Sequence, residues 1–304
     1  MADARLLVVT ADDFGIGPET SRGILDLADQ GVVTSTVLLV NSPYAAESIA
    51  TWRDRGARLE MGWHPCLTLD RPLAAPESIP SLVNESGEFY PLGQVLKRLL
   101  RGQIPQAEIT IEYRAQLARY QELVGSLPPA VNHHHHLHIF GPCARALHEV
   151  LSEAGCQPYI RRVIERPGTL FRIPGARSKR VLLTRFGART ARVHARSGYP
   201  GNDELLGITD PPFVNDPAFF ERWLRQSSGK QVELACHPGY LDATIEERDG
   251  SLADGQLHRR AAERTLLSGP KFRQAVAAAG FRLVSATEMS FAQNRSPLPG
   301  PAAL

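Results

Sequence analysis

Two adjacent carboxylates, Asp12 and Asp13, follow the short apolar segment at residues 6–10. At the end of a buried strand, neighbouring carboxylates lose hydration and repel each other unless a cation or a shared proton compensates. Adjacent residues of a strand point to opposite faces, so we expect different roles: one carboxylate binds a metal ion and the other contacts a water molecule. The pair alone is equally compatible with a cap on the next helix.

Histidines supply the second group of candidate ligands. His64 follows a strand-like run, and five histidines stand in the segment NHHHHLH at residues 132–138. In an extended chain, His134, His136 and His138 lie on one face and the remaining two on the other. Five imidazoles are a poor way to fill a core, so the segment predicts a metal site, with a hydrogen-bonded or solvated cluster as the alternative.

His237 ends another strand-like run, residues 232–236, and precedes a Pro-Gly turn. The carboxyl ends of parallel barrel strands meet at one rim, where active sites assemble, so this histidine should join the others there. One carboxylate and two neutral imidazoles leave coordination positions open for water and substrate. A metal-bound water loses its proton more easily, a spare carboxylate can accept that proton, and a spare imidazole can protonate the leaving group. The pattern therefore predicts a metal-dependent hydrolase.

The elements that must position these residues alternate between strand and helix. Short apolar runs rich in β-branched residues predict strands, and amphipathic segments predict helices. The predicted strands are residues 6–10, 35–40, 59–63, 130–132, 232–236 and 281–285, and the clearest predicted helices are residues 18–30 and 258–279. This alternation indicates an α/β protein with a parallel sheet and favours a TIM-like (β/α) barrel. We expect a single barrel domain over residues 1–292 and a flexible Pro-rich tail at 293–304.

The composition is that of an ordinary folded protein. Of the 304 residues, 43% are hydrophobic and 22% are charged, which excludes disordered, collagen-like and coiled-coil classes. The formal net charge is only +2, so no global basic field points to nucleic acid. Four cysteines without a CxxC pair argue against a zinc ribbon or a small disulfide scaffold and favour a reducing compartment. Since no apolar run suits a membrane span or a signal peptide, we expect a cytoplasmic protein.

Positive charge is concentrated at residues 161–196. This interval contains eleven Lys and Arg residues against the single acid Glu165, a local charge of +10, so the rest of the chain sums to about −8. The simpler interpretation is a solvated, arginine-rich excursion or an oligomer contact. The functional interpretation is attraction for an anionic substrate or a phosphate-bearing carrier.

Five segments together resemble the YdjC-type carbohydrate deacetylases, a family that includes chitooligosaccharide deacetylases and hopanoid-biosynthesis-associated deacetylases. The segments are TADDFG (10–15), VVTSTVLLVN (32–41), GWHPCLT (62–68), the histidine-rich segment (132–138) and CHPGY (236–240), in the family's order. The resemblance implies a distorted or incomplete (β/α) barrel, a homodimer and a divalent metal ion. The family is usually described with magnesium, although a His₂Asp ligand set suits zinc better. The implied reaction is hydrolysis of the N-acetyl group of an amino sugar, giving a free amine and acetate.

Carried over by motif position, the resemblance implies a role for each rim residue. Asp13, His64 and His134 would be the metal ligands. Asp12 would be the general base that activates water, and His237 would be the acid or a stabiliser of the transition state.

The histidine-rich segment departs from the family's pattern. Many relatives have Asp-Ser where this chain has Asn132 and His133, and Asn132 resembles the hopanoid-associated branch. The extra imidazole leaves open whether His133, His134 or His136 is the ligand. His136 and His138 match further family histidines, which would orient the ligands or line the pocket.

The expected substrate is an N-acetylated amino sugar, which the basic interval suggests is anionic. Phe14, Thr68, Arg162 and Tyr240 lie near motif positions and are candidates for a sugar pocket, although each is also compatible with packing or a surface position. Two other functions are open: a metal-dependent phosphoesterase on a related barrel, and a non-catalytic barrel that binds sugar or metal. The first is disfavoured because such barrels commonly carry an HxH pair on the first strand. The second is disfavoured because simple binding needs no spare carboxylate.

Overall fold

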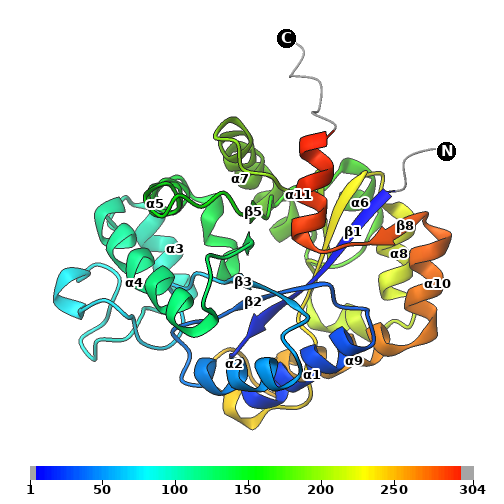
Figure 1. Cartoon of the computed structure of the whole chain (residues 1–304), viewed down its shortest axis with the longest axis horizontal. Coiled ribbons are helices and arrows are strands. Elements are labelled where there is room, and N and C mark those ends of the chain that lie inside the picture. The colour runs from blue at the N-terminus through cyan, green and yellow to red at the C-terminus, as the bar shows by residue number, and fades with distance from the viewer. Residues whose placement is uncertain (1–4, 296–304) are drawn as a thin grey trace.

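The computed structural model describes residues 5–295, and in it helices surround a parallel sheet (Figure 1). The strands are β1 (Arg5–Phe14), β2 (Ser35–Leu38), β3 (Glu60–Trp63), β4 (Ala130–Val131), β5 (Tyr159–Ile160), β6 (Glu204–Leu206), β7 (Gln231–Cys236) and β8 (Phe281–Leu283). The hydrogen-bonded order is β5-β4-β3-β2-β1-β7-β6, and its ladders are parallel. β8 pairs with the first residues of β1, and β2 pairs with the last residues of β1.

Helices make most of the crossovers between these strands. They are α1 (Pro18–Asp29), α2 (Ala45–Asp54), α3 (Leu92–Leu100), α4 (Gln106–Val124), α5 (Gly141–Glu153), α6 (Pro167–Arg172), α7 (Arg177–Arg196), α8 (Phe219–Gln226), α9 (Gln256–Ser268), α10 (Pro270–Ala278) and α11 (Ala286–Arg295). Four 3₁₀ turns interrupt the loops: η1 (Pro76–Ser78), η2 (His134–Ile139), η3 (Pro211–Asn215) and η4 (Ala243–Ile245). None of the helices in the described part of the chain has the length and apolar character that a bilayer crossing requires.

The sheet curls into an incomplete barrel, as the family resemblance implies. The two edge strands of the hydrogen-bonded order are β5 and β6. These two edges approach each other through irregular backbone bonds, in which Ile160 N donates to Pro200 O (2.8 Å) and Leu205 N donates to Ile164 O (2.7 Å). The carboxyl ends of the strands therefore share one rim, as in a closed barrel.

β1 lies at the centre of the core. Leu7, Val8, Val9 and Ala11 have no solvent exposure, as expected for a parallel strand covered on both faces. At the rim, α1 packs against the loop after β7 so closely that a Cβ on Gly23 would lie 2.9 Å from Gly239 Cα. This contact fixes the Pro-Gly turn that follows His237.

Two sequence expectations need correction or a limit. The long helix predicted at residues 258–279 is wrong, because α9 ends at Ser268 and α10 begins at Pro270. Proline lacks the N–H that would continue the first helix and is well suited to start the second. Most of the tail predicted at 293–304 lies outside the described residues, which end at 295.

Candidate active site

β1 brings both of its carboxylates to one cluster. The register between β1 and β2 shifts between Ala11 and Phe14, and Asp13 has a φ of 65°. Such a bulge re-aims side chains at the end of a strand. The backbone at Asp13 therefore departs from ideal strand geometry, and the two carboxylates contact different partners.

Asp13 lies among two histidines and an arginine. Its Oδ1 is 3.2 Å from His64 Nε2 and 3.0 Å from His134 Nδ1, and Arg260 Nη2 donates to its Oδ2 at 2.7 Å. Burial alone would raise the pKa of Asp13, but Arg260 and the histidines hold this pKa well below its usual range. One potential ligand atom from each of Asp13, His64 and His134 lies within 4.8 Å of the others.

The protonation pattern of this trio fits a bound cation. His64 Nδ1 must donate to Asn132 O (2.9 Å), since a carbonyl oxygen only accepts, so a neutral His64 turns the Nε2 lone pair toward Asp13. The lone pair of His64 Nε2 and the carboxylate oxygen of Asp13 would repel each other at 3.2 Å unless a cation or a proton lay between them. The other nitrogen of His134, Nε2, is buried without a hydrogen-bond partner and lies 3.4 Å from Asp249 Oδ1, so His134, His135 and Asp249 form a second group of possible ligands. One carboxylate and two imidazoles suit zinc or a similar divalent ion.

His133 uses both of its ring nitrogens elsewhere. Nδ1 donates to His134 O at 2.8 Å, which leaves Nε2 to accept from the Tyr113 hydroxyl. Burial lowers the pKa of His133 well below its usual value, and the neighbouring imidazoles add to this effect, consistent with a neutral ring. Among the three ligand positions left open by the sequence, these bonds favour His134 over His133.

The histidine-rich segment is not extended as expected. It forms the turn η2, in which His135 and His136 have φ values of 56° and 57°, so the alternation of faces along the segment is wrong. His138 donates from Nε2 to Arg161 O at 3.0 Å, while His136 Nδ1 is buried without a partner. Burial, together with Arg161, His138 and Lys179, lowers the pKa of His136 well below its usual value.

Asp12 is held by a buried guanidinium. Arg161 donates to both carboxylate oxygens, at 2.6 and 2.8 Å, and Asn132 Nδ2 donates to Oδ1 at 3.1 Å. Burial alone would raise the pKa of Asp12, but Arg161 lowers this pKa overall, so the side chain is a carboxylate at neutral pH. Its Oδ2 lies 3.8 Å from His237 Nε2.

His237 is held by residues of α9. Its backbone N–H donates to Glu263 Oε2 at 2.5 Å, and Arg259 bridges the two by donating to Glu263 Oε1 (2.7 Å) and to His237 Nδ1 (3.3 Å). A guanidinium cannot accept a hydrogen bond, so a neutral His237 carries its proton on Nε2, the nitrogen nearer Asp12. Burial and Arg259 lower the pKa of His237.

The four candidates for a sugar pocket have different environments. Phe14 is fully buried in the main hydrophobic core, and Tyr240 donates to Asp26 Oδ2 (2.8 Å) on α1. Arg162 donates to Tyr199 O at 3.0 Å. Thr68 bonds to His135 Nδ1 at 2.9 Å, so it alone of the four contacts the histidine-rich turn. Phe14 therefore belongs to the core, and a sugar-binding role for the other three stays a prediction.

Several cluster residues were missed by the sequence reading. Arg161 and Arg260 hold the two aspartates, Asp249 faces His134, and Glu233 accepts from Arg161 Nε at 2.8 Å. Glu233 could have been predicted from the sequence, because an acid inside the apolar strand VELAC needs a buried partner.

The basic interval is also less uniform than its composition suggests. Arg161 and Arg180 have no solvent exposure, and Arg180 pairs with Glu165 at 2.6 Å. A solvated excursion is therefore the wrong description of these two residues.

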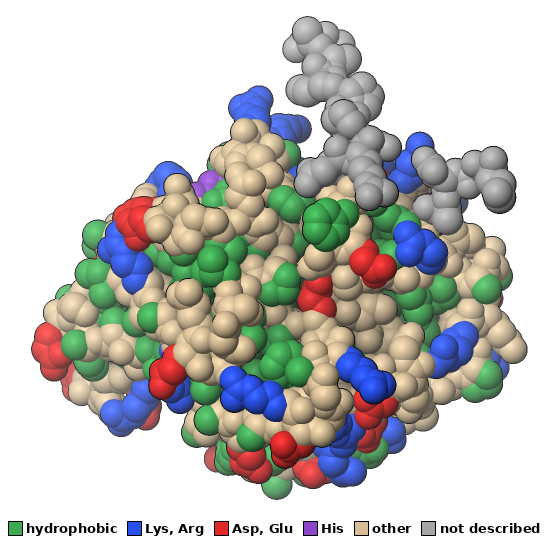
Figure 2. All heavy atoms as spheres, in the orientation of Figure 1, with side chains coloured by type: hydrophobic (Ala, Val, Ile, Leu, Met, Phe, Trp, Pro, Cys, Tyr) green, Lys and Arg blue, Asp and Glu red, His purple; other side chains and the backbone are tan. Residues whose placement is uncertain are grey.

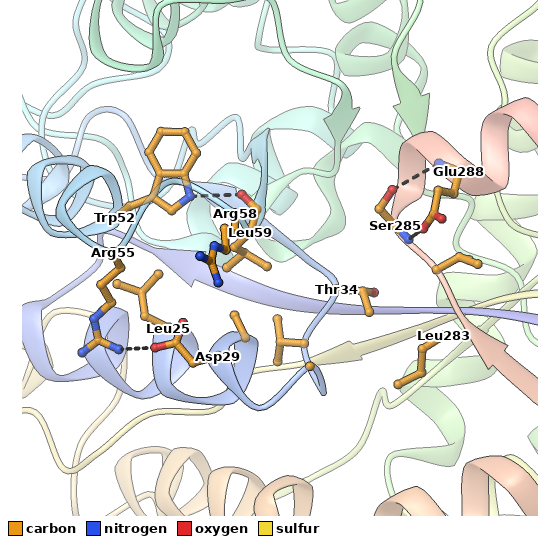
Figure 3. Close-up of a pocket in the computed structure, with 14 residues that line it drawn as sticks. Leu25, Asp29, Thr34, Trp52, Arg55, Arg58, Leu59, Leu283, Ser285 and Glu288 are labelled. Carbon is orange, nitrogen blue, oxygen red and sulfur yellow. Dashed lines mark hydrogen bonds and ion pairs between the residues drawn. The ribbon is translucent and has the colours of Figure 1, made fainter.

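A cavity of about 500 Å³ lies away from this cluster, between α1, α2 and the start of α11 (Figure 3). Its polar side chains are largely paired: Arg55 contacts Asp29 at 3.1 Å, and Trp52 donates to Leu59 O at 3.0 Å. None of the clustered carboxylates or histidines lines it. The candidate active site is therefore the rim cluster and not this cavity.

The fold and the cluster define an incomplete (β/α) barrel with a candidate metal centre on the carboxyl-terminal rim. The YdjC-like protein family profile matches residues 6–278, and the chain belongs to this family.

Two curated relatives cover almost the whole chain. A chitooligosaccharide deacetylase of Serratia marcescens is 30% identical over 285 residues, which is 92% of this chain and 98% of the relative. A carbohydrate deacetylase of Geobacillus stearothermophilus is 31% identical over 288 residues, with coverage of 93% and 98%. The crystal structure of a candidate cellobiose-phosphate cleavage protein from Enterococcus faecalis matches with a TM-score of 0.74 at 23% identity, over 94% of this chain and 99% of that one. This likeness shows that the two proteins share a fold.

Proposed function

We propose that this protein is a metal-dependent hydrolase that removes the N-acetyl group from an N-acetylated amino sugar and releases acetate. Family membership and the names of the two curated relatives support the class of reaction. The observation that carries the proposal is the pairing of a candidate ligand trio with a separate, ionised carboxylate, Asp12, at the same rim. Metal binding alone would not require Asp12 or His237 beside the trio.

Asp13, His64 and His134 would hold the divalent ion, which when bound supplies a Lewis acid that polarises the acetyl carbonyl and acidifies water. Asp12 accepts the proton of the attacking water. Arg161 and Asn132 occupy its other lone pairs and fix its orientation.

His237 donates a hydrogen bond from Nε2 toward the reacting amide. Because Arg259 occupies Nδ1, the donor nitrogen is defined before substrate binds. The departing amine takes the proton that Asp12 accepted from the water, so His237 keeps its Nε2 proton and stabilises the developing charge by its hydrogen bond. Pre-oriented donors of this kind typically lower a barrier by about 3 to 4 kcal/mol.

The test is acetate release from N-acetylglucosamine oligomers and from lipid- or nucleotide-linked N-acetyl sugars, before and after chelation and metal restoration. Release that returns with metal supports the proposal. A protein with full metal occupancy that releases no acetate from any substrate contradicts it and favours the phosphoesterase or the binding-only alternative.

Two substitutions separate the proposed roles. Asp12→Asn should retain metal and lose turnover, because it keeps the side-chain shape but removes the proton acceptor. His64→Ala should lose both metal and turnover. Normal turnover by Asp12→Asn would exclude Asp12 as the base.

The identity of the metal, a homodimer, a cytoplasmic location and an anionic substrate stay predictions from the sequence.

A further inference from the structure

The outer face of α7 combines positive charge with exposed apolar side chains. Helix α7 stands at the edge of the molecule, and Figure 2 shows Lys or Arg side chains at its outer end. We define the α7 face as the exposed arginines and the exposed large apolar residues of this helix, together with Phe171 of the preceding α6. Its members are Phe171, Arg177, Val181, Leu182, Arg185, Arg189, Arg192, Val193 and Arg196.

The apolar members of the α7 face are unusually open to solvent. Phe171 is 61% exposed, Leu182 55% and Val193 44%. The opposite side of the same helix is packed, since Leu183 and Phe186 lie against a buried cluster that includes Ile139. Burial of the inner side therefore leaves the outer apolar side chains without an intramolecular role.

The charges of the α7 face also lack partners. No Asp or Glu occurs between residues 166 and 202. Within residues 5–295, none of the five arginines of the face forms an ion pair, whereas the inward-facing Arg180 does. Unneutralised guanidinium groups beside exposed leucine, valine and phenylalanine are typical of helices that lie on anionic membrane surfaces.

We propose that the α7 face docks on a bilayer that contains anionic phospholipid. The arginines would contact headgroup phosphates, and Phe171, Leu182 and Val193 would enter the interface between headgroups and acyl chains. A second copy of this chain is a poor occupant, because two such faces would place like charges together. Nucleic acid would satisfy the arginines but would give the aliphatic side chains no matching partner.

The helix that carries the α7 face packs, through its inner side, against a turn of the candidate active site. Helix α7 packs against η2, the turn that contains His134 and His136. Docking through this face would hold the rim close to the membrane. If the proposed function is correct, on which this step rests, the substrate is an amino sugar carried on a membrane lipid.

Binding is tested by co-sedimentation of the full chain with phosphatidylcholine vesicles, with and without one quarter phosphatidylglycerol. The wild type should bind only the anionic vesicles, and less at high salt. Replacing Arg185, Arg189 and Arg192 with Gln should weaken binding by about 100-fold, since each cation near an anionic surface contributes about fivefold. Leu182→Ser with Val193→Ser should also weaken binding, at unchanged charge.

The matched control replaces three exposed arginines on other elements, Arg71, Arg101 and Arg225, with Gln. This control has the same net charge as the α7 triple variant and should bind like the wild type. Equal weakening by both triple variants would overturn the proposal, as would equal binding to neutral vesicles or none to either. Stronger binding to a short DNA duplex, lost in the α7 variant but unaffected by the two Ser substitutions, would overturn it in favour of nucleic acid.

Activity separates the docking surface from the proposed reaction. The α7 triple variant and the wild type should release acetate from soluble diacetylchitobiose at equal rates. On an N-acetylglucosaminyl lipid in anionic vesicles, kcat/KM of the variant should fall at least about tenfold. A wild type that binds vesicles but releases acetate from neither substrate contradicts the proposed function and leaves the docking surface supported. Equal rates of the two proteins on the lipid substrate would overturn the lipid-substrate step.

Discussion

Arg259 Nη2 donates to His237 Nδ1 at 3.3 Å, and this contact determines which nitrogen of a neutral His237 carries the proton. The backbone of His237 and the side chain of Arg259 both bind Glu263, so histidine and arginine are positioned by one carboxylate. His237 Nε2 is then a donor 3.8 Å from Asp12 Oδ2. The two residues proposed to act on the substrate are thus held by different arginines, Asp12 by Arg161 and His237 by Arg259.

Replacing Arg259 with Gln should raise the pKa of His237, because burial and this guanidinium are the main causes of its low value. Fixed donation to Nδ1 should also be lost. The measurement is a nitrogen-15 NMR titration of the imidazole, read for both its midpoint and its tautomer. Arg264→Gln is the control, since Arg264 lies on the same helix but stacks on Tyr240. An unchanged His237 titration in Arg259→Gln would exclude this cause of the shift.

His134→Gln should weaken divalent metal binding by about 100-fold or more, whereas His133→Gln should leave metal affinity within about tenfold of the wild type. The reason is that His134 Nδ1 faces Asp13 Oδ1 at 3.0 Å within the ligand trio, while the nitrogens of His133 are bonded to Tyr113 and to His134 O. Calorimetric titration with zinc and with magnesium gives both affinities. A larger loss of metal affinity in His133→Gln than in His134→Gln would assign the ligand to His133.

The sequence was sufficient to place the site at one rim because the fold is parallel. Asp12, His64 and His237 each follow an apolar run, and parallel strands bring such positions together whatever their separation in the chain. The incomplete closure was expected from family resemblance alone. Strand-like runs are too short and too similar to one another to reveal which edges fail to pair.

Local backbone irregularity limited the rest of the prediction. The bulge at Asp13 and the left-handed residues His135 and His136 depart from ideal periodicity, which is the only guide that sequence pattern offers. The supporting arginines were invisible for a different reason. Arg161 and Arg260 reach Asp12 and Asp13 from 149 and 247 residues away, and each looked like one more surface cation.

Arg161→Met tests whether the buried ion pair has a stabilising role that depends on pH. In the wild type, the lowered pKa of Asp12 contributes stability above the unfolded pKa, and this contribution is lost as the pH falls through the folded pKa. Without Arg161, burial dominates and the pKa of Asp12 lies above its unfolded value. The variant then gains stability when Asp12 is protonated and loses it as the pH rises.

We therefore expect Arg161→Met to lower the free energy of unfolding by about 3 to 5 kcal/mol at neutral pH, and by clearly less at pH about 5. Urea unfolding of wild type and variant at both pH values measures the difference. Arg166→Met is the control, because Arg166 makes a partly exposed pair with Asp203 (3.3 Å) and its loss should cost at most about 1 kcal/mol. The same loss at both pH values would show that Arg161 acts through packing and not through the charges of Asp12 and Glu233, since an uncharged packing defect is indifferent to protonation.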